Sequence, residues 1–223
     1  MVTAMWYVLR TGLPWRDLPG QFGPWSSIYT RFRRWSRCGL WARLFQRLRS
    51  HAWGQIRSID CSHVKVHADG ANPAGGQSRQ AMGRTKGGLN TKVAATVDAL
   101  GRPVQLAVAP GPQHDLLACA AFLPSLHDCW LLADRGFDAD DFRQQLDDQG
   151  VRTCIPPRSG RRWPSRFSRR LHRQRHTVEN FFGRIKRYRR IATRYEKLAD
   201  HYLGFLLFTA VLDWLKFGSE DRP

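Results

Sequence analysis

The spacing of apolar residues changes near Gln55, from the interval of a helix to that of a strand. Upstream of this point, apolar side chains recur every three or four residues, which is typical of amphipathic helices. Downstream, three segments have the composition of strands, and the last two are joined by the turn sequence D-A-L-G-R. These strands are predicted at residues 56–67, 91–97 and 103–110. The chain therefore begins with helices and continues with three strands, of which two form a hairpin.

The rest of the pattern alternates helices with short apolar strands. Helices are predicted at residues 115–126, 140–149, 171–190 and 198–217, and strands at 130–134 and 151–156. The last helix is apolar nearly all round, so we expect it to be buried. The glycine-rich stretch 70–88 predicts a functional or a disordered loop. The resulting class is α/β, a mixed sheet with flanking helices, in the element order of the RNase H-like fold.

Residues 1–52 predict a small helical region, which precedes an α/β domain at residues 53–223. Its first helix covers residues 1–10, and two further helices at about 26–37 and 40–49 are separated by a glycine. The layout of the last two resembles a helix-turn-helix. We expect their exposed arginines to contact DNA, namely Arg33, Arg34 and Arg37. An ordinary packed helix pair with solvated arginines is the alternative.

The charge of the chain favours a polyanionic partner. The 36 lysines and arginines outnumber the 18 aspartates and glutamates, which gives a net charge of +18 and a pI near 10.9. The excess lies in residues 1–50 and 151–197, whereas residues 51–150 are slightly acidic. An acidic centre between basic segments is typical of a metal-dependent nuclease, whose carboxylates hold cations while its arginines hold phosphates. A basic surface without catalysis is the alternative.

The sequence argues against a membrane protein and against a zinc or disulfide scaffold. Its longest apolar run, residues 203–212, is about half a bilayer span, and residues 1–10 lack the pattern of a signal peptide. The five cysteines are scattered and never have C-x-x-C spacing. We therefore expect a cytoplasmic protein with reduced cysteines and no membrane partner.

Two aspartates end apolar strands. Asp60 follows S-I, and Asp134 lies in L-L-A-D-R-G. In α/β proteins, sites lie at such strand ends. A carboxylate in so apolar a segment needs a cation or several hydrogen bonds to offset its desolvation. Either aspartate alone could simply cap a neighbouring turn, but the two together favour a site.

Glu179 is the third candidate carboxylate. At 100° per residue, His172, Arg175, Glu179 and Lys186 fall on one narrow stripe of the predicted helix, beside its apolar face. Glu179 is therefore expected at the edge of the core, among cations that can hold phosphate. The alternative is a plain salt bridge between Arg175 and Glu179, one helical turn apart.

The segment from His172 to Lys197 resembles the C-terminal signature of DDE transposases of bacterial insertion sequences, in the IS-five family. That signature consists of a tyrosine, two residues, an arginine, three residues, a glutamate, six residues and a lysine. Arg175, Glu179 and Lys186 match it in register, and His172 replaces the tyrosine. The segment L-L-A-D-R-G-F-D resembles the motif of the second aspartate, and S-I-D-C-S-H-V-K-V-H that of the first. The segment W-Y-V-L-R-T-G-L-P-W-R-D-L-P resembles the N-terminal region of the family.

The resemblance implies that Asp60, Asp134 and Glu179 bind two Mg²⁺ ions, for which Mn²⁺ can substitute. It implies strand cleavage at the ends of an insertion sequence, followed by strand transfer to target DNA. The partners are then the terminal inverted repeats and the target, bound by a homo-oligomer associated with the bacterial nucleoid. The expected DNA-binding residues of the C-terminal segment are Arg175, Lys186, His172, Arg187 and Arg190.

Family members usually continue upstream of W-Y-V-L-R-T-G with a further helical segment. The resemblance therefore implies an N-terminally truncated or frameshift-split reading frame. We expect Met5, Trp6, Val8 and Leu9 to form an exposed apolar patch, because nothing upstream would cover them. The alternative function is that of a catalytically impaired, truncated transposase that acts only as a DNA-end-binding protein.

Overall fold

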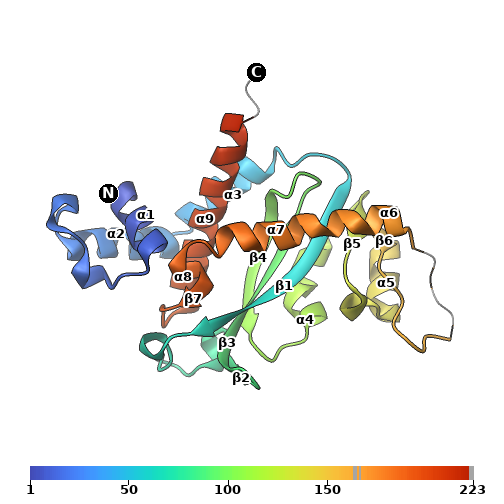
Figure 1. Cartoon of the computed structure of the whole chain (residues 1–223), viewed down its shortest axis with the longest axis horizontal. Helices are drawn as coiled ribbons and strands as arrows, with labels where there is room; N and C mark the ends of the chain where they lie inside the picture. The colour runs from blue at the N-terminus through green and yellow to red at the C-terminus, as the bar shows by residue number, and fades with distance from the viewer. Residues whose placement is uncertain (163–164, 166, 221–223) are drawn as a thin grey trace.

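A mixed sheet forms the centre of the computed structural model, which describes residues 1–162, 165 and 167–220 (Figure 1). Within these residues the sheet has seven strands. Five of them follow the order β4–β3–β1–β5–β6, in which β3 is antiparallel to β4 and β1, and β1, β5 and β6 are parallel. This topology is that of an RNase H-like fold and confirms the predicted class. The bounds are β1 (Ile56–Val66), β3 (Gly88–Val97), β4 (Pro103–Pro110), β5 (Trp130–Leu132) and β6 (Arg152–Cys154).

Two short strands were outside the sequence prediction. β2 (Gly83–Thr85) pairs with the start of β3, and β7 (Thr193–Arg194) runs parallel to the end of β1. β2 lies in the glycine-rich stretch, which also contains the 3₁₀ turns η3 (Ala68–Gly70) and η4 (Ser78–Gln80). Met82, beside β2, is only 1% exposed. The predicted loop is therefore partly built into the sheet and the core.

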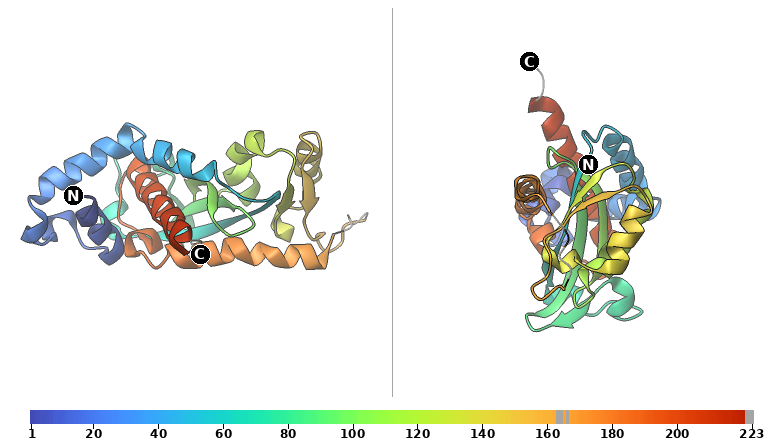
Figure 2. Two further views of the ribbon diagram at one scale, coloured as in Figure 1. Left: turned by 90° about the horizontal axis from the view of Figure 1, so that it is seen from above. Right: turned by 90° about the vertical axis from the view of Figure 1, so that its right-hand side faces the viewer.

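Helices cover both faces of the sheet (Figure 2). Successive side chains of β3 point to opposite faces, so Val93 and Val97 pack with Phe181 of helix α7, whereas Ala94 packs with Phe142 of helix α5. The strand is consequently buried on both sides. On one face lies α7 (His176–Ile185), and on the other lie α4 (Asp115–Cys119), the 3₁₀ helix η5 (Ala120–Ser125) and α5 (Asp140–Asp147).

The N-terminal helices pack against the long C-terminal helix α9 (Ala199–Glu220) (Figure 1). Phe32 of α2 stacks on Phe205 of α9 with ring centroids 4.2 Å apart, and Trp41 of α3 contacts Phe208 at 4.5 Å. These residues share one hydrophobic cluster with Val64 of β1. The helices are α1 (Val2–Thr11), α2 (Trp25–Arg37) and α3 (Leu40–Arg49), with the turns η1 (Trp15–Asp17) and η2 (Gly20–Phe22) between α1 and α2. The predicted division after residue 52 falls between α3 and β1 and stays a prediction.

The expected exposed patch on the first helix is wrong. Met5, Val8 and Leu9 are fully buried, and of the four residues only Trp6 is exposed, at 40%. The cause is that α1 packs on α2 and on α8 (Arg189–Ala192), a contact between distant parts of the chain. No helix of the described residues combines the length and the apolar character that crossing a bilayer requires.

Two predicted helices are interrupted. The helix expected at residues 171–190 is divided into α6 (Arg169–His172), the 3₁₀ turn η7 (Arg173–Arg175), α7 and α8. Tyr188 ends this run with an extended backbone, because its ring is buried in the core. The helix expected at 115–126 continues only as the 3₁₀ helix η5, which contains Pro124. The arginine-rich segment 156–170, whose composition predicts a linker, lies partly outside the described residues.

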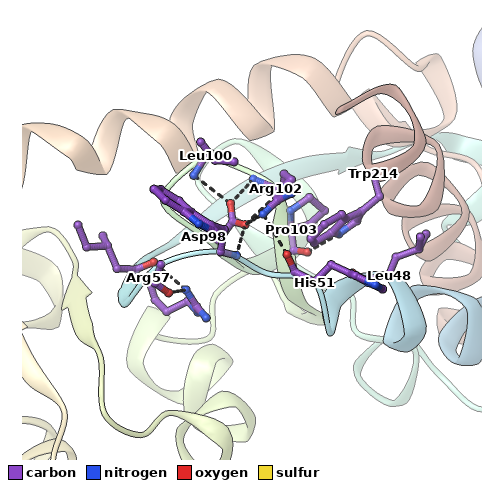
Figure 3. A network of polar contacts seen from close by, with 12 residues as sticks. Leu48, His51, Arg57, Asp98, Leu100, Arg102, Pro103 and Trp214 are labelled. Carbon is purple, nitrogen blue, oxygen red and sulfur yellow. Dashed lines mark hydrogen bonds and ion pairs between the residues drawn. The ribbon is translucent and has the colours of Figure 1, made fainter. Parts of the chain in front are cut away.

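A polar network fastens the start of β1 to the β3–β4 hairpin (Figure 3). The carboxylate of Asp98 is fully buried and accepts hydrogen bonds from the backbone N–H groups of Trp53, Leu100 and Arg102 and from Nε of Arg102. Arg102 in turn donates to the carbonyl of His51. The strand that carries Asp60 is thereby anchored at its N-terminal end.

We predict that Asp98→Ala destabilises the fold by about 3 to 5 kcal/mol, because a buried guanidinium and several backbone donors lose their acceptor. Urea unfolding followed by circular dichroism measures this loss. Asp147→Ala, at an exposed position of α5, is the matched control and should change the unfolding free energy by less than about 0.5 kcal/mol. Equal effects of the two variants would contradict the anchoring role.

Candidate active site

The register of two parallel strands brings Asp60 and Asp134 to the same level of the sheet. Ser58 of β1 lies opposite Leu132 of β5, and each aspartate follows its strand partner by two residues. Asp60 lies inside β1, not at the end of the strand where the sequence predicted it. Its side chain is only 20% exposed, and burial is the main cause that raises its pKa. The negative charge of Asp134 raises the pKa of Asp60 as well. Two candidate carboxylates therefore lie close enough to repel each other.

One face of β1 contacts the helix that carries Glu179. Thr177 of α7 donates a hydrogen bond to the hydroxyl of Ser58, at 3.3 Å. Lys186, which follows α7, donates to the hydroxyl of Ser62, at 2.7 Å. Asp60 lies between these two serines on the same face, because side chains two residues apart point the same way on a strand. The face is thus a polar row in contact with α7.

Arg175 joins two of the three candidate carboxylates. Its guanidinium donates to Oδ2 of Asp60 at 2.9 Å and to Oε1 of Glu179. Arg175 and Asp60 are mostly buried, with side-chain exposures of 17% and 20%, whereas Glu179 is 54% exposed. The salt bridge between Arg175 and Glu179, which was the alternative prediction for Glu179, is therefore present. It belongs to a larger arrangement that also includes Asp60.

Asp134 has a local partner of its own. Its Oδ1 accepts a hydrogen bond from the backbone N–H of Gly136 at 2.8 Å and caps the 3₁₀ turn η6 (Arg135–Phe137). The turn-capping alternative is thus present for this residue too, beside its proximity to Asp60. His172 lies next to it, with Nε2 3.1 Å from the carbonyl oxygen of Ala133. His172 is therefore in contact with the segment that carries Asp134, a contact that the sequence did not predict.

The carboxylates of Asp60, Asp134 and Glu179 are chemically suited to a hard divalent cation, but their present positions do not form a metal site. Carboxylate oxygens are the ligands that Mg²⁺ and Mn²⁺ prefer. Yet in the described part of the chain no three His, Cys, Asp or Glu side chains are grouped closely enough to hold an ion. Instead, the guanidinium of Arg175 neutralises Asp60 and Glu179. In this arrangement Arg175 competes with a cation for Oδ2 of Asp60 and Oε1 of Glu179.

The predicted DNA-binding residues divide into three groups. Arg33, Arg34, Arg37 and Arg187 are exposed, as a phosphate contact requires. Lys186 is half-buried, burial lowers its pKa, and its ammonium group also lies 3.3 Å from the carbonyl of His63. Arg175 is held by carboxylates, so its phosphate contact stays a prediction.

The prediction that Arg190 contacts a phosphate does not agree with this structure. Arg190 is only 5% exposed and is paired with Glu196. It also donates to the carbonyl of Leu13, at 2.6 Å. The helical pattern did not reveal this burial, because the chain leaves the helix at Tyr188 and turns α8 toward the N-terminal segment.

Asp138, four residues after Asp134, was not among the predicted site residues. It is 2% exposed and accepts hydrogen bonds from Nε of Arg143 at 2.8 Å, from Nη1 of Arg161 at 2.8 Å and from the backbone N–H of Arg158 at 2.7 Å. Burial acts to raise the pKa of Asp138, but these hydrogen bonds outweigh it and lower the pKa. The motif L-L-A-D-R-G-F-D did contain this second aspartate as a signal. Its neighbours give it a structural role in supporting the segment after Asp134.

Two family models match parts of the chain. Residues 1–45 match a family described as "Putative transposase of IS4/5 family", and residues 131–216 match "Transposase DDE domain". Asp134 and Glu179 lie inside the second range, whereas Asp60 lies outside both.

Two curated relatives come from insertion sequences. The chain is 33% identical over 139 residues to the "Putative transposase for insertion sequence element IS6501" of Brucella ovis, covering 57% of this chain and 100% of that protein. It is 34% identical over 86 residues to the "Insertion element IS402 uncharacterized 16.2 kDa protein" of Burkholderia cepacia, covering 38% of this chain and 56% of that protein.

Solved structures of the Mos1 transposase are more distant. The pre-cleavage Mos1 transpososome and the paired-end complex with the left transposon end each match with 12% identity and a TM-score of 0.32. The matches cover 100% and 99% of this chain and 78% of each Mos1 chain. At this level of similarity, the Mos1 structures do not define the site residues of this chain.

The fold and its carboxylate-bearing strands define an RNase H-like enzyme domain. The family matches then make the identification specific: the chain belongs to the DDE transposases of bacterial insertion sequences, in the IS4/5 group. The resemblance found in the sequence is thereby confirmed.

We predict that Arg175 and Asp60 are coupled by about 1 to 2 kcal/mol in the unfolding free energy, because their ion pair is largely buried and charge-assisted. A double-mutant cycle with Arg175→Ala and Asp60→Asn, followed by urea unfolding, measures this coupling. The control cycle uses Arg37 and Asp200, whose side chains are 56% and 45% exposed and 3.9 Å apart. Its coupling should stay below about 0.5 kcal/mol. A buried pair no more strongly coupled than the exposed pair would contradict this geometry.

Proposed function

We propose that this transposase cleaves DNA strands at the ends of an insertion sequence and transfers them to target DNA, with Asp60, Asp134 and Glu179 as its metal ligands. One observation carries the assignment: two of these carboxylates converge on Arg175, and the third is close enough to raise the pKa of Asp60. Two carboxylates that share one guanidinium, with a third close enough to repel one of them, are difficult to explain by stability alone. Like charges at close range destabilise a fold.

Mg²⁺ is the proposed ion, and Mn²⁺ can substitute, since both prefer oxygen ligands. A pair of such ions would activate the attacking oxygen and stabilise the leaving oxygen of a phosphodiester. The chain's own residues hold and orient the reactants. Released from the carboxylates, Arg175 offers a planar fork of donors suited to a phosphate. Lys186 and Arg187 would contact the same strand, and His172 would support the turn that positions Asp134.

The arginines of α2 are proposed as a second DNA contact. Arg33, Arg34 and Arg37 are exposed, and α2 is held firmly against α9 by the stacked rings of Phe32 and Phe205. A rigid helix with exposed arginines suits the phosphates of a terminal repeat. We further propose that the protein acts as a homo-oligomer on DNA, in the bacterial cytoplasm and at the nucleoid. The alternative, a protein that only binds element ends, is an outcome of the test that follows.

Asp60→Ala, Asp134→Ala and Glu179→Ala should each abolish Mg²⁺-dependent cleavage of an element-end duplex, because each removes a ligand that the substrate cannot replace. Gel assays of a labelled duplex measure cleavage, and anisotropy measures binding. Duplex affinity should remain within about threefold, since each variant removes only negative charge. Asp147→Ala is the matched control and should cleave like the parent. Binding without cleavage by the parent itself would support the end-binding alternative.

Arg175→Gln should bind Mn²⁺ about five- to tenfold more tightly in the absence of DNA, because Asp60 and Glu179 lose a competing cation. Titration followed by electron paramagnetic resonance measures free Mn²⁺ directly. Arg173→Gln removes the same charge from an exposed neighbouring position and serves as the control. If Arg175→Gln binds Mn²⁺ more weakly, the guanidinium instead holds Glu179 ready as a ligand.

The affinity for duplex DNA should fall steeply with salt, with a log-log slope of about −0.9 per phosphate neutralised. Replacing Arg33, Arg34 and Arg37 together by glutamine should reduce the magnitude of this slope by about 2 to 3. Anisotropy titrations at several salt concentrations measure it. Arg152→Gln, on β6 at the other end of the molecule in Figure 1, is the control. An unchanged slope in the triple variant would remove α2 from the DNA interface.

A further inference from the structure

An aromatic cleft separates the N-terminal helices from the end of β1, outside the candidate active site. It has a volume of about 1090 Å³ and lies between η1, α2 and the segment 195–198 that precedes α9. Neither the family matches nor the proposed chemistry gives it a role. Its walls, its floor and its rim each have a distinct composition.

The walls of the aromatic cleft are rings that remain partly accessible. Trp15, Trp25 and Tyr29 line it from the N-terminal side, and Tyr195 lines it from the other side. Trp15 and Tyr29 contact each other with centroids 5.5 Å apart, and Tyr195 is held in place by the ring of His67 at 4.7 Å. Half-exposed, immobilised rings are platforms on which a flat heteroaromatic group can stack.

The floor holds unsatisfied polar atoms. In the described part of the chain, four buried side-chain polar atoms lack a hydrogen-bond partner, and three of them belong to residues that line this cleft. They are Nε of Arg190, Oε2 of Glu196 and Nε2 of His201. These residues are only 5%, 7% and 6% exposed. Unpaired buried polar atoms are costly, so three beside one cavity point to a ligand that both donates and accepts hydrogen bonds.

The rim carries two cations and one carboxylate, that of Asp69, which is also exposed. Arg16 and Lys197 are exposed, and the guanidinium of Arg16 lies 5.6 Å from the ring centroid of Trp25. Burial lowers the pKa of His201, and the nearby charges of Arg33 and Arg37 lower it further, against the opposing effect of Asp200. The cleft therefore opens beside the α2 arginines already proposed to hold DNA.

We propose that the aromatic cleft binds one unpaired nucleobase of the DNA strand that crosses this surface. Stacking rings combined with flanking cations are what single-stranded nucleic acid requires. Guanine fits the floor best, because its N1–H and N2–H groups can both donate to Oε2 of Glu196 while its O6 accepts from Nε of Arg190, the two atoms that lack partners. The proposal rests on the proposed DNA partner, but it requires neither metal nor cleavage.

The position of the cleft relates this base to the candidate active site. The cleft lies beside the end of β1, where His67 contacts Tyr195, seven positions along the chain from Asp60. At the rise of a strand this is roughly 20 Å, or about six nucleotides of a DNA strand. The unpaired base is thus expected several nucleotides away from the scissile phosphate.

Anisotropy in EDTA, where no cleavage occurs, tests the proposal with a labelled 16-nucleotide thymine strand carrying one central guanine. The plain thymine strand and a 16-base-pair duplex are compared with it. We expect Trp25→Ala and Tyr29→Ala each to weaken binding of the guanine strand at least fivefold, and duplex binding less than twofold. Trp53→Ala, at a tryptophan that is 63% exposed and does not line the cleft, is the matched control and should change neither. Glu196→Gln should remove the preference for guanine over thymine.

A second measurement uses the unaltered protein, in case a variant fails to fold. A strand with 6-methylisoxanthopterin in place of the guanine, a fluorescent analogue that keeps the N1–H, N2–H and O6-type groups, should lose fluorescence on binding, because the base stacks on the cleft rings. No loss of fluorescence, or equal losses of single-strand and duplex affinity in the variants, would overturn the proposal while leaving DNA binding intact. Absence of binding to both kinds of DNA would overturn the proposed function together with this inference.

Discussion

The pairing of β1 with its two neighbours is the constraint on which the rest of the structure depends. Antiparallel contact with β3 and parallel contact with β5 place the strand in the middle of the sheet. Its alternating side chains then divide between two layers: Ile59 enters one core, and Asp60 lies on the face that meets α7. A shift of one residue would exchange these faces and place the carboxylate in an apolar core. The Asp98 network at the start of β1 opposes such a shift.

Electrostatics explains how so many like charges coexist around β1. Asp60 and Asp134 repel each other, and burial makes the ionised form of Asp60 more costly. Arg175 offsets both effects by an ion pair that also includes Glu179. A protein that binds both divalent cations and polyanionic DNA needs carboxylates for the cations and basic side chains for the phosphates. Arg175 compensates one of the negative charges in this group of carboxylates, and exposed arginines lie on α2 and next to α8.

The sequence predicted most of the fold and of the candidate site. Strand composition located β1, β3 and β4, and the helical stripe placed Arg175, Glu179 and Lys186 on one side of α7. It failed for Arg190 and for the first helix, where burial depends on contacts between segments nearly two hundred residues apart. Both were expected to be exposed, because a local pattern records which residues share a face and not what packs against that face. β2 and β7 escaped prediction for a similar reason, since strands so short form only beside a partner.

By itself, the sequence determined the order of the main elements, the three candidate carboxylates, and the family to which the spacing of the C-terminal motif belongs. These depend on periodicity and on residue chemistry, which are local properties. Only the tertiary structure decided that Arg175 bridges Asp60 and Glu179, that Arg190 turns inward to Glu196, and that aromatic rings from η1 and α2 face Tyr195 across a cleft. Each of these depends on which distant surfaces meet, and that is set by burial of apolar area over the whole chain.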